Sequence, residues 1–218
     1  MAGQYRYVAR FDIRSYYESM NHAILLKLLK EANIDVGDYA LVSDYLSLPD
    51  TKLTGCGMVA GGSISPLLGA VYLTPLDRAM EQLQPRRDIR YQRFMDDYVI
   101  FAQTRHKLKA ALRCMYRILE QLKLTVHPDK RSIGTTHRGF DFLGYRIHPD
   151  RKLRPAVQSL NRLIVRSRRL YEQGVDENRL RQYVQRWFIW LHSGLRNRFS
   201  NTGGFNRIWL FVMKHLRI

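Results

Sequence analysis

Two patterns of apolar residues alternate along the first part of the chain. Aromatic and β-branched residues dominate the run from Tyr5 to Asp12, which predicts a strand that ends at Asp12. Apolar residues then recur at helical spacing after Asn21, a good N-cap residue, so a helix is expected to begin there. A second helix is expected over residues 39–46, before a glycine-rich loop.

A third helix is expected to begin at Ser65-Pro66, because proline at the first turn lacks only an N–H that has no partner there. Its inward face would carry Leu68, Val71, Tyr72, Leu76 and Met80. Residues 89–94 and 98–102 predict a β-hairpin, and 139–147 a further strand or hairpin. Between the hairpin and the segment 139–147, an amphipathic helix is expected, with the apolar stripe Leu108, Leu112, Met115, Leu119 and Leu122. This order predicts an α+β fold with helices on one face of an antiparallel sheet.

The composition changes after residue 148. From Arg151 to the end, fifteen Lys or Arg stand against three acidic residues. Two stretches of this region, 159–171 and 178–199, have helical patterns of apolar residues. We therefore expect a second, small all-α domain, and the chain to divide into residues 1–148 and 149–218.

The formal net charge is +17 and the isoelectric point is near 10.2. Such an excess of positive charge favours a nucleic acid as partner over an ordinary basic surface. Cys56 and Cys114 are far apart in the sequence and support neither a zinc cluster nor a disulfide framework. Because no signal peptide and no membrane-spanning apolar run is evident, we expect a cytoplasmic protein that has no membrane partner.

Two adjacent acidic residues, Asp96 and Asp97, lie between apolar runs at the turn of the predicted hairpin. Two carboxylates about 4 Å apart repel each other by about 4 kcal/mol at an effective dielectric constant near 20, so the pair requires a counter-charge. If the strand that ends at Asp12 is a neighbour, three carboxylates meet at one sheet edge. Such oxygen ligands suit two Mg²⁺ ions about 3.5–4 Å apart, as in phosphoryl transfer. Alternatively, Asp12 merely caps its strand.

Five segments resemble the sequence motifs of the reverse transcriptase family, and those of its bacterial group-II-intron-like members in particular. They follow the order and spacing of the family over about residues 5–147: Phe11–His22, Gly61–Pro66, Phe94–Asp97, Leu124–Lys130 and Phe140–Tyr145. The resemblance implies a polymerase palm followed by a helical thumb. It also implies synthesis of DNA from dNTPs on an RNA template, with a DNA primer or an RNA/DNA duplex as the bound nucleic acid.

The resemblance further implies the ligands of the metal ions. Asp12 and Asp96 would bind both of two Mg²⁺ ions, and Asp97 would support them. The main-chain carbonyl of Ile13 would complete one of the sites. Mn²⁺ is an alternative to Mg²⁺ with such oxygen ligands.

Four residues match family positions at the incoming nucleotide: Tyr17, Ala60, Gly61 and Lys130. The bulk of Tyr17 would exclude a ribose 2′-hydroxyl, unless the ring is simply part of the core. Gly61 would let the backbone approach the nucleotide. Lys130 would stabilise or protonate the leaving pyrophosphate, with an ordinary surface lysine as the alternative.

Two further sets of residues would contact the template–primer duplex. The segment that would grip the primer 3′ end is Phe142-Leu143-Gly144. The cations that would follow the nucleic-acid backbone lie at helical positions i, i+4 and i+7, namely Arg162, Arg166 and Arg169. A solvated basic face without a ligand is the alternative. The apolar tail from Phe205 to Ile218 is expected to pack on the thumb or on a partner rather than on a membrane surface.

Two departures from the family pattern matter. Ala60 replaces the usual Gln, as in low-fidelity relatives from diversity-generating retroelements, but those relatives lack the equivalent of Pro66, so we do not assign the chain to them. Only eleven residues precede Asp12, where the family has a long fingers region. We therefore expect the fingers to be absent, to be lost through a truncated reading frame, or to come from a protein partner or a second copy. The alternatives are a non-catalytic palm-fold subunit that binds nucleic acid, and template-independent or protein-primed DNA synthesis in phage defence.

Overall fold

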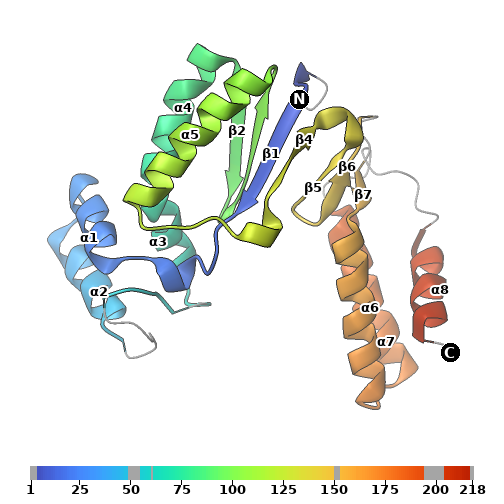
Figure 1. The fold of residues 1–218 in the computed structure, drawn as a ribbon. Coiled ribbons are helices and arrows are strands. Elements are labelled where there is room, and N and C mark those ends of the chain that lie inside the picture. Colours follow the sequence, from blue (N-terminus) through green and yellow to red (C-terminus); the bar gives the residue numbers. More distant parts are fainter. Residues whose placement is uncertain (1–3, 49–54, 60, 150–152, 194–203, 217–218) are drawn as a thin grey trace. The chain divides into compact units, whose positions relative to one another are not determined.

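The computed structural model describes residues 4–48, 55–59, 61–149, 153–193 and 204–216 (Figure 1). By packing, the chain divides into two compact units, an N-terminal unit Gln4–Gly134 and a C-terminal unit that comprises Thr135–Ile218. This division by packing lies before residue 148, where the sequence predicts the boundary between palm and thumb. The boundary between palm and thumb stays a prediction. Each unit is described by itself.

The N-terminal unit contains a four-stranded sheet with the strand order β2-β3-β1-β4. Strand β3 pairs antiparallel with both β1 and β2. The bounds of the strands are Tyr7–Asp12 (β1), Ile89–Phe94 (β2), Asp97–Ala102 (β3) and Ser132–Thr135 (β4). The predicted first strand and the predicted hairpin are thus confirmed, and they are neighbours in one sheet.

Helices α4 (Thr74–Arg87) and α5 (Arg105–Gln121) cover one face of this sheet (Figure 1). The central strand β3 is buried from Tyr98 to Ala102, and the Tyr98 ring stacks on Phe11 with 5.7 Å between ring centroids. Met80 from α4 and Met115 from α5 complete the core beside them. Burial of this apolar surface is the main force that keeps the carboxylate-bearing ends of β1 and β3 together.

The remaining helices of this unit are η2 (Tyr17–Ser19), α1 (His22–Glu31), α2 (Val36–Leu46), α3 (Ser65–Tyr72) and η3 (Pro128–Lys130). Asn21 caps α1 as predicted, because its side chain accepts a hydrogen bond of 3.2 Å from the Ile24 amide. The single helix expected from Ser65 to Met80 is wrong, since two helices meet at Leu73. Pro75 explains the break, because it has no N–H to continue the hydrogen bonding of α3.

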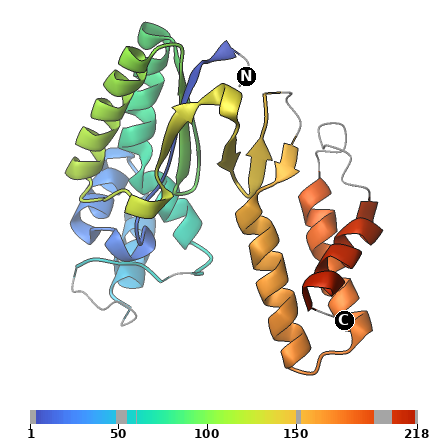
Figure 2. The same ribbon diagram turned by 45° about the vertical axis from the view of Figure 1, so that its right-hand side comes forward.

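The described part of the C-terminal unit combines a small sheet with the helices α6, α7 and α8 (Figure 2). Its strands pair antiparallel in the order β5-β6-β7. Their bounds are Phe140–Phe142, Tyr145–Ile147 and Leu153–Pro155, and η4 (Thr136–Arg138) precedes them. The helices are α6 (Val157–Glu172), α7 (Glu177–His192) and α8 (Gly204–Leu216). The region after residue 148 is therefore not all helical, since β7 completes the sheet.

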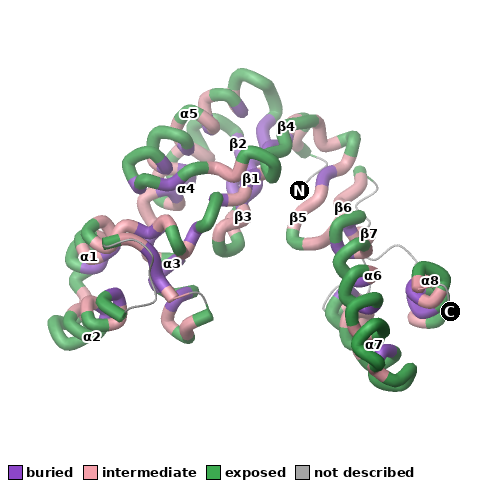
Figure 3. Tube along the Cα trace, turned by 60° about the horizontal axis from the view of Figure 1, so that its bottom comes forward, coloured by how far each residue is buried: buried purple, intermediate pink, exposed green. Residues whose placement is uncertain are grey.

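Helices α6, α7 and α8 enclose a second apolar core. Figure 3 shows purple buried positions on each of them, and the buried residues are Leu163, Leu180, Val184, Ile208, Trp209 and Val212. The apolar tail thus packs on the helices of its own unit, as expected. The helix expected over residues 178–199 ends at His192, and residues 194–199 lie outside the described part of the chain. No described helix has the length and apolar content to cross a membrane.

A tight turn at Leu143 and Gly144 joins β5 to β6, because Phe142 pairs directly with Tyr145. Both turn residues have positive φ, 49° and 83°, as in a type I′ turn. A Cβ on Gly144 would lie 2.9 Å from the Ser159 hydroxyl oxygen and 3.1 Å from the Trp190 ring. The glycine therefore serves both the backbone conformation and the close packing against α6 and α7.

Gly144→Ala is expected to lower the free energy of unfolding by about 2–4 kcal/mol, because backbone strain and overpacking add. Gly174→Ala is the matched control. Gly174 has a φ of 75°, but no atom of the described residues lies within 4 Å of the position that a Cβ would take, so only the backbone cost of about 1–2 kcal/mol applies. Urea unfolding of both variants measures the difference. Equal losses would contradict the packing role.

Candidate active site

Three acidic residues stand at one edge of the N-terminal sheet. Asp12 ends β1 and Asp97 begins β3, and the two residues stand opposite each other in the antiparallel register. Asp96 precedes Asp97 in the turn from β2. The condition on which the sequence argument depended, that these strands are neighbours, is therefore met.

Burial and mutual repulsion act on this cluster. Burial raises the pKa of the Asp96 carboxyl, and the charge of Asp12 raises it further. Burial likewise raises the pKa of Asp97, with added contributions from the charges of Asp12 and Asp96. The charge of Arg10, and then that of Lys130, opposes the shift of Asp97, and Lys130 also opposes that of Asp96. The negative charges of the three carboxylates therefore repel one another. Additional positive charge at the cluster would favour the ionised forms of Asp96 and Asp97.

Lys130 makes a direct contact with the cluster. Its Nζ lies 3.1 and 3.0 Å from the two carboxylate oxygens of Asp12. The segment before Lys130 is fixed beside β1, because the His127 amide donates a 2.8 Å hydrogen bond to the Asp12 carbonyl and the Arg14 amide donates one of 2.9 Å to the Thr125 carbonyl. The structure thus places Lys130 on a candidate metal ligand, while its contact with a nucleotide remains a prediction.

The donor set suits a hard divalent cation, since carboxylate oxygens are the ligands that Mg²⁺ prefers. A nearby cation would stabilise the ionised forms of Asp96 and Asp97, whose pKa values are raised. Among the described residues, however, no three His, Cys, Asp or Glu side chains are grouped closely enough to hold one ion. The residues therefore fit a metal by chemistry and charge but are not preassembled around one.

Tyr17 lies in η2, near enough to Asp96 for the charge of that residue to act on it. It is half-buried, and its ring centroid is 5.4 Å from that of Tyr16. Burial raises its pKa, and the charge of Asp96 adds to the shift. The neighbouring Tyr16 is buried and donates a hydrogen bond to the Gly69 carbonyl of α3. Tyr17 thus combines partial packing on the core with a place beside Asp96, so both interpretations of this ring remain.

The glycine-rich loop before α3 is fixed by Ser65, which the sequence marked only as the start of a helix, and by Tyr45, which sequence reasoning missed. The Ser65 hydroxyl donates a 2.6 Å hydrogen bond to the Val59 carbonyl and lies 2.9 Å from the Tyr45 hydroxyl. A Cβ on Gly62 would collide with the Tyr45 hydroxyl oxygen. Gly61 has a φ of 85° and no described atom near the position of a Cβ, whereas Ala60 lies outside the described residues.

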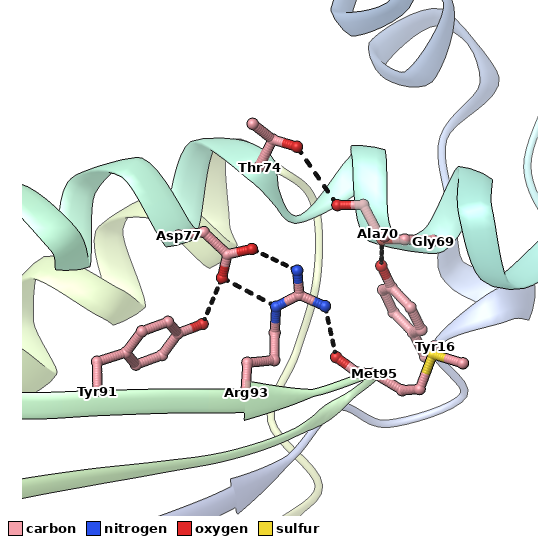
Figure 4. A network of polar contacts seen from close by, with 8 residues as sticks. All are labelled: Tyr16, Gly69, Ala70, Thr74, Asp77, Tyr91, Arg93 and Met95. Carbon is pink, nitrogen blue, oxygen red and sulfur yellow. Dashed lines mark hydrogen bonds and ion pairs between the residues drawn. The ribbon is translucent and has the colours of Figure 1, made fainter.

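Figure 4 shows a polar network between α4 and β2 that extends to Met95, the residue before Asp96. Asp77 on α4 accepts hydrogen bonds from Tyr91 and Arg93 on β2, and Arg93 in turn donates one to the Met95 carbonyl. The sequence offers no signal for Asp77, because a single acidic residue in the first turn of a helix is common.

The other candidate residues belong to the C-terminal unit. Phe142 ends β5 and is half-buried, and the turn after it carries Leu143, which is 38% exposed and so open to a ligand. The Gly144 carbonyl accepts hydrogen bonds of 2.9 Å from the Ala156 amide and the Ser159 hydroxyl, which fix the turn to α6. All three expected backbone-binding residues are exposed on α6: Arg162, Arg166 and Arg169.

Comparisons with known proteins identify the family and the fold of the chain. Residues 1–147 match the family model described as reverse transcriptase (RNA-dependent DNA polymerase). Protein YkfC of Escherichia coli (strain K12) is 24% identical over 178 residues, which cover 65% of this chain and 47% of that protein. The chain therefore spans about half the length of this curated relative.

The solved structures that resemble the chain include two telomerases. That of Candida albicans, in complex with a TWJ fragment of telomeric RNA, has a TM-score of 0.56 at 15% identity, over 96% of this chain and 40% of that one. Apo telomerase of Candida tropicalis has a TM-score of 0.56 at 13% identity, over 97% of this chain and 46% of that one. The fold is thus the α+β palm and thumb type. Because the family model covers more than half of the sequence, the chain belongs to the reverse transcriptase (RNA-dependent DNA polymerase) family.

Proposed function

We propose that this chain is the palm and thumb of an RNA-directed DNA polymerase, which transfers nucleotides from dNTPs to a primer 3′ end. The observation that carries the proposal is the register of the sheet, in which Asp12 faces Asp97 and Asp96 stands beside it. Membership of the family makes nucleotidyl transfer the natural use of such a cluster.

In this proposal Asp12, Asp96 and Asp97, with the Ile13 carbonyl, hold two Mg²⁺ ions, or Mn²⁺ in their place. Bound metal would supply charge that activates the primer hydroxyl and offsets the charge of the triphosphate. The chain also supplies a cation of its own, since Lys130 is the counter-ion of Asp12 in the structure. Once Asp12 takes another partner, the Lys130 ammonium is available to donate a proton to the leaving pyrophosphate.

The same proposal assigns selectivity for dNTPs to Tyr17, with Ala60 and Gly61 lining the nucleotide. Tyr17→Ala is expected to raise incorporation of ribonucleotides relative to deoxynucleotides by about 10–200-fold, the usual range for one small group in a pocket. Tyr17→Phe is the control, because it keeps the bulk of the ring. Competition assays with matched rNTP and dNTP measure the ratio. If both variants exclude rNTPs as well as the parent chain does, Tyr17 is a core residue only.

In the proposal, the C-terminal unit contacts the primer and the duplex, and a fingers region completes the nucleotide site. We assign the primer 3′ end to the turn at residues 142–144 and the duplex backbone to Arg162, Arg166 and Arg169. The chain covers under half of the telomerase chains and of YkfC. A fingers region from a longer protein, a partner or a second copy would therefore complete the nucleotide site.

A primer-extension assay tests the proposal. An RNA template with an annealed DNA primer, dNTPs and Mg²⁺ or Mn²⁺ is incubated with the chain alone, with fingers-bearing candidate partners, and with Asp12→Asn in each setting. We expect template-dependent extension that Asp12→Asn abolishes. Extension without a template, or from a protein hydroxyl, would instead indicate the synthesis known from phage-defence relatives.

One observation favours a second candidate, a non-catalytic subunit that binds nucleic acid. The Asp12 carboxylate already has a partner in Lys130, and the described residues hold no preassembled group of three metal ligands. Tight duplex binding without extension in any of these settings would favour that role and would overturn the polymerase proposal.

A further inference from the structure

Arg93 is a charged residue on the inner face of the sheet. Along β2, Ile89 and Tyr91 are buried while Arg90 and Gln92 are exposed, and the alternation places Arg93 on the buried side. Its side chain is only 13% exposed. A guanidinium at such a place destabilises the fold unless it is paired and hydrogen-bonded.

Asp77 in the first turn of α4 supplies that pairing (Figure 4). Its Oδ1 accepts a 2.9 Å hydrogen bond from Arg93 Nε, and its Oδ2 pairs with Arg93 Nη2. The Tyr91 hydroxyl donates a 2.8 Å hydrogen bond to the same Oδ1. This two-point contact uses the planar fork of the guanidinium and fixes its plane, which a lysine ammonium cannot do.

The remaining nitrogen reaches the turn that carries Asp96. Arg93 Nη1 donates a 2.9 Å hydrogen bond to the main-chain carbonyl of Met95. Phe94 pairs directly with Asp97, so Met95 and Asp96 form a two-residue hairpin loop, and the Met95 carbonyl belongs to its central peptide. The guanidinium is therefore hydrogen-bonded to the central peptide of this loop.

The turn needs such a contact, because its sequence does not suit its conformation. Met95 has a φ of 55°, whereas Asp96 is not among the described residues with positive φ. This is the sign pattern of a type II′ turn, whose first position favours glycine. A side chain in the left-handed region costs about 1–2 kcal/mol. A flip of the central peptide leads toward type I′, which requires positive φ at Asp96, and aspartate tolerates this.

We propose that Arg93, held by Asp77 and Tyr91, is a positioning residue that locks the Met95–Asp96 peptide and so directs Asp96 at the carboxylates of Asp12 and Asp97. The catalytic consequence depends on the polymerase function proposed above. The effect on the turn does not, because it is a property of the chain without nucleotide. Asp77 belongs to the same device, since without it the guanidinium loses its orientation.

Arg93→Lys and Asp77→Asn test the proposal, with Arg90→Lys on the exposed face of the same strand as matched control. Both test variants are expected to lower kcat for dNTP incorporation by about 10–100-fold, as for a misplaced reacting group, while KM for dNTP stays within about twofold. The control is expected to match the parent chain. Parent-like kcat in Arg93→Lys would overturn the proposal.

Met95→Gly separates positioning from a merely structural role. Glycine adopts the type II′ conformation without help, so in the Met95→Gly background the kcat loss caused by Arg93→Lys is expected to shrink about tenfold. If Arg93 only stabilises the fold, the loss follows the unfolding temperature and glycine does not reduce it. That result would overturn the proposal.

Hydrogen exchange of the metal-free protein gives a readout without catalysis. Amides of residues 94–98 are expected to exchange at least about tenfold faster in Arg93→Lys and Asp77→Asn than in Arg90→Lys. If the parent chain shows no polymerase activity but this difference appears, the proposed function fails and the role of Arg93 in the turn stands. Equal exchange in all three variants contradicts that role even if the chain is active.

Discussion

Asp96→Asn is expected to reduce nucleotide incorporation by at least about 10³-fold and, at the same time, to raise the unfolding temperature of the metal-free protein at neutral pH. The loss follows if Asp96 is a ligand of catalytic metal, since metal ligands contribute several kcal/mol to the transition state. The gain follows because Asp96 is half-buried and its pKa is raised by burial and by Asp12. The amide removes a charge that destabilises the fold.

The sign of the pH dependence follows from the same shifts. Because the folded-state pKa values of Asp96 and Asp97 lie above those of the unfolded chain, the folded state binds these protons more tightly. Their contribution to stability is therefore complete below the unfolded pKa, near 4, and is lost as pH rises through the folded pKa. Asp96→Asn should flatten this part of the stability curve, and Mg²⁺ should restore stability at high pH in the parent chain only.

Thermal unfolding between pH 4 and pH 8, with and without Mg²⁺, measures both effects. Asp44→Asn on the exposed side of α2 is the control, because it removes the same charge away from the cluster. If Asp44→Asn changes the curve as much as Asp96→Asn does, the effect belongs to net charge alone. Retained incorporation by Asp96→Asn would exclude this carboxylate as a metal ligand.

The parts of the fold that the sequence predicts are those with strong local patterns. The strand at residues 7–12 and the hairpin at 89–102 alternate or cluster β-branched and aromatic residues, and both are confirmed. The break at Leu73 was missed because the apolar spacing continues through it, and Pro75 suits the start of a helix as well as its interruption. Strand β7 was missed because three residues inside a basic region give no periodic signal.

In the candidate site, the sequence predicts which acidic residues gather but not which side chains pair with them. Clustering of the acidic residues followed from one condition, that β1 and β3 are neighbours, and the register meets it. The contact of Lys130 with Asp12 and the clamp of Asp77 on Arg93 join residues far apart in the sequence. Single-residue types at such separations carry no pairing information in one sequence, so only the packed structure reveals them.

Substitution of Arg162, Arg166 and Arg169 together by Gln is expected to reduce the salt dependence of duplex binding. The three arginines lie on the exposed side of α6, opposite the buried Leu163 and Ser167. Each phosphate contact contributes about 0.9 to the slope of log K against log salt, because a counter-ion is released from the duplex. If all three contact phosphates, the slope becomes shallower by about 2–3, and affinity falls most at low salt.

Fluorescence anisotropy of a labelled RNA/DNA duplex measures this slope. The titration covers about 50 to 200 mM KCl, because phosphate contacts change affinity most over that range of salt. The control replaces three arginines of the N-terminal unit that are also exposed: Arg86, Arg87 and Arg90. Both triple variants remove the same charge from a chain of net charge +17, so long-range attraction weakens equally. A larger slope change for the α6 variant indicates direct phosphate contacts. Equal changes would mean that α6 is only a solvated basic face.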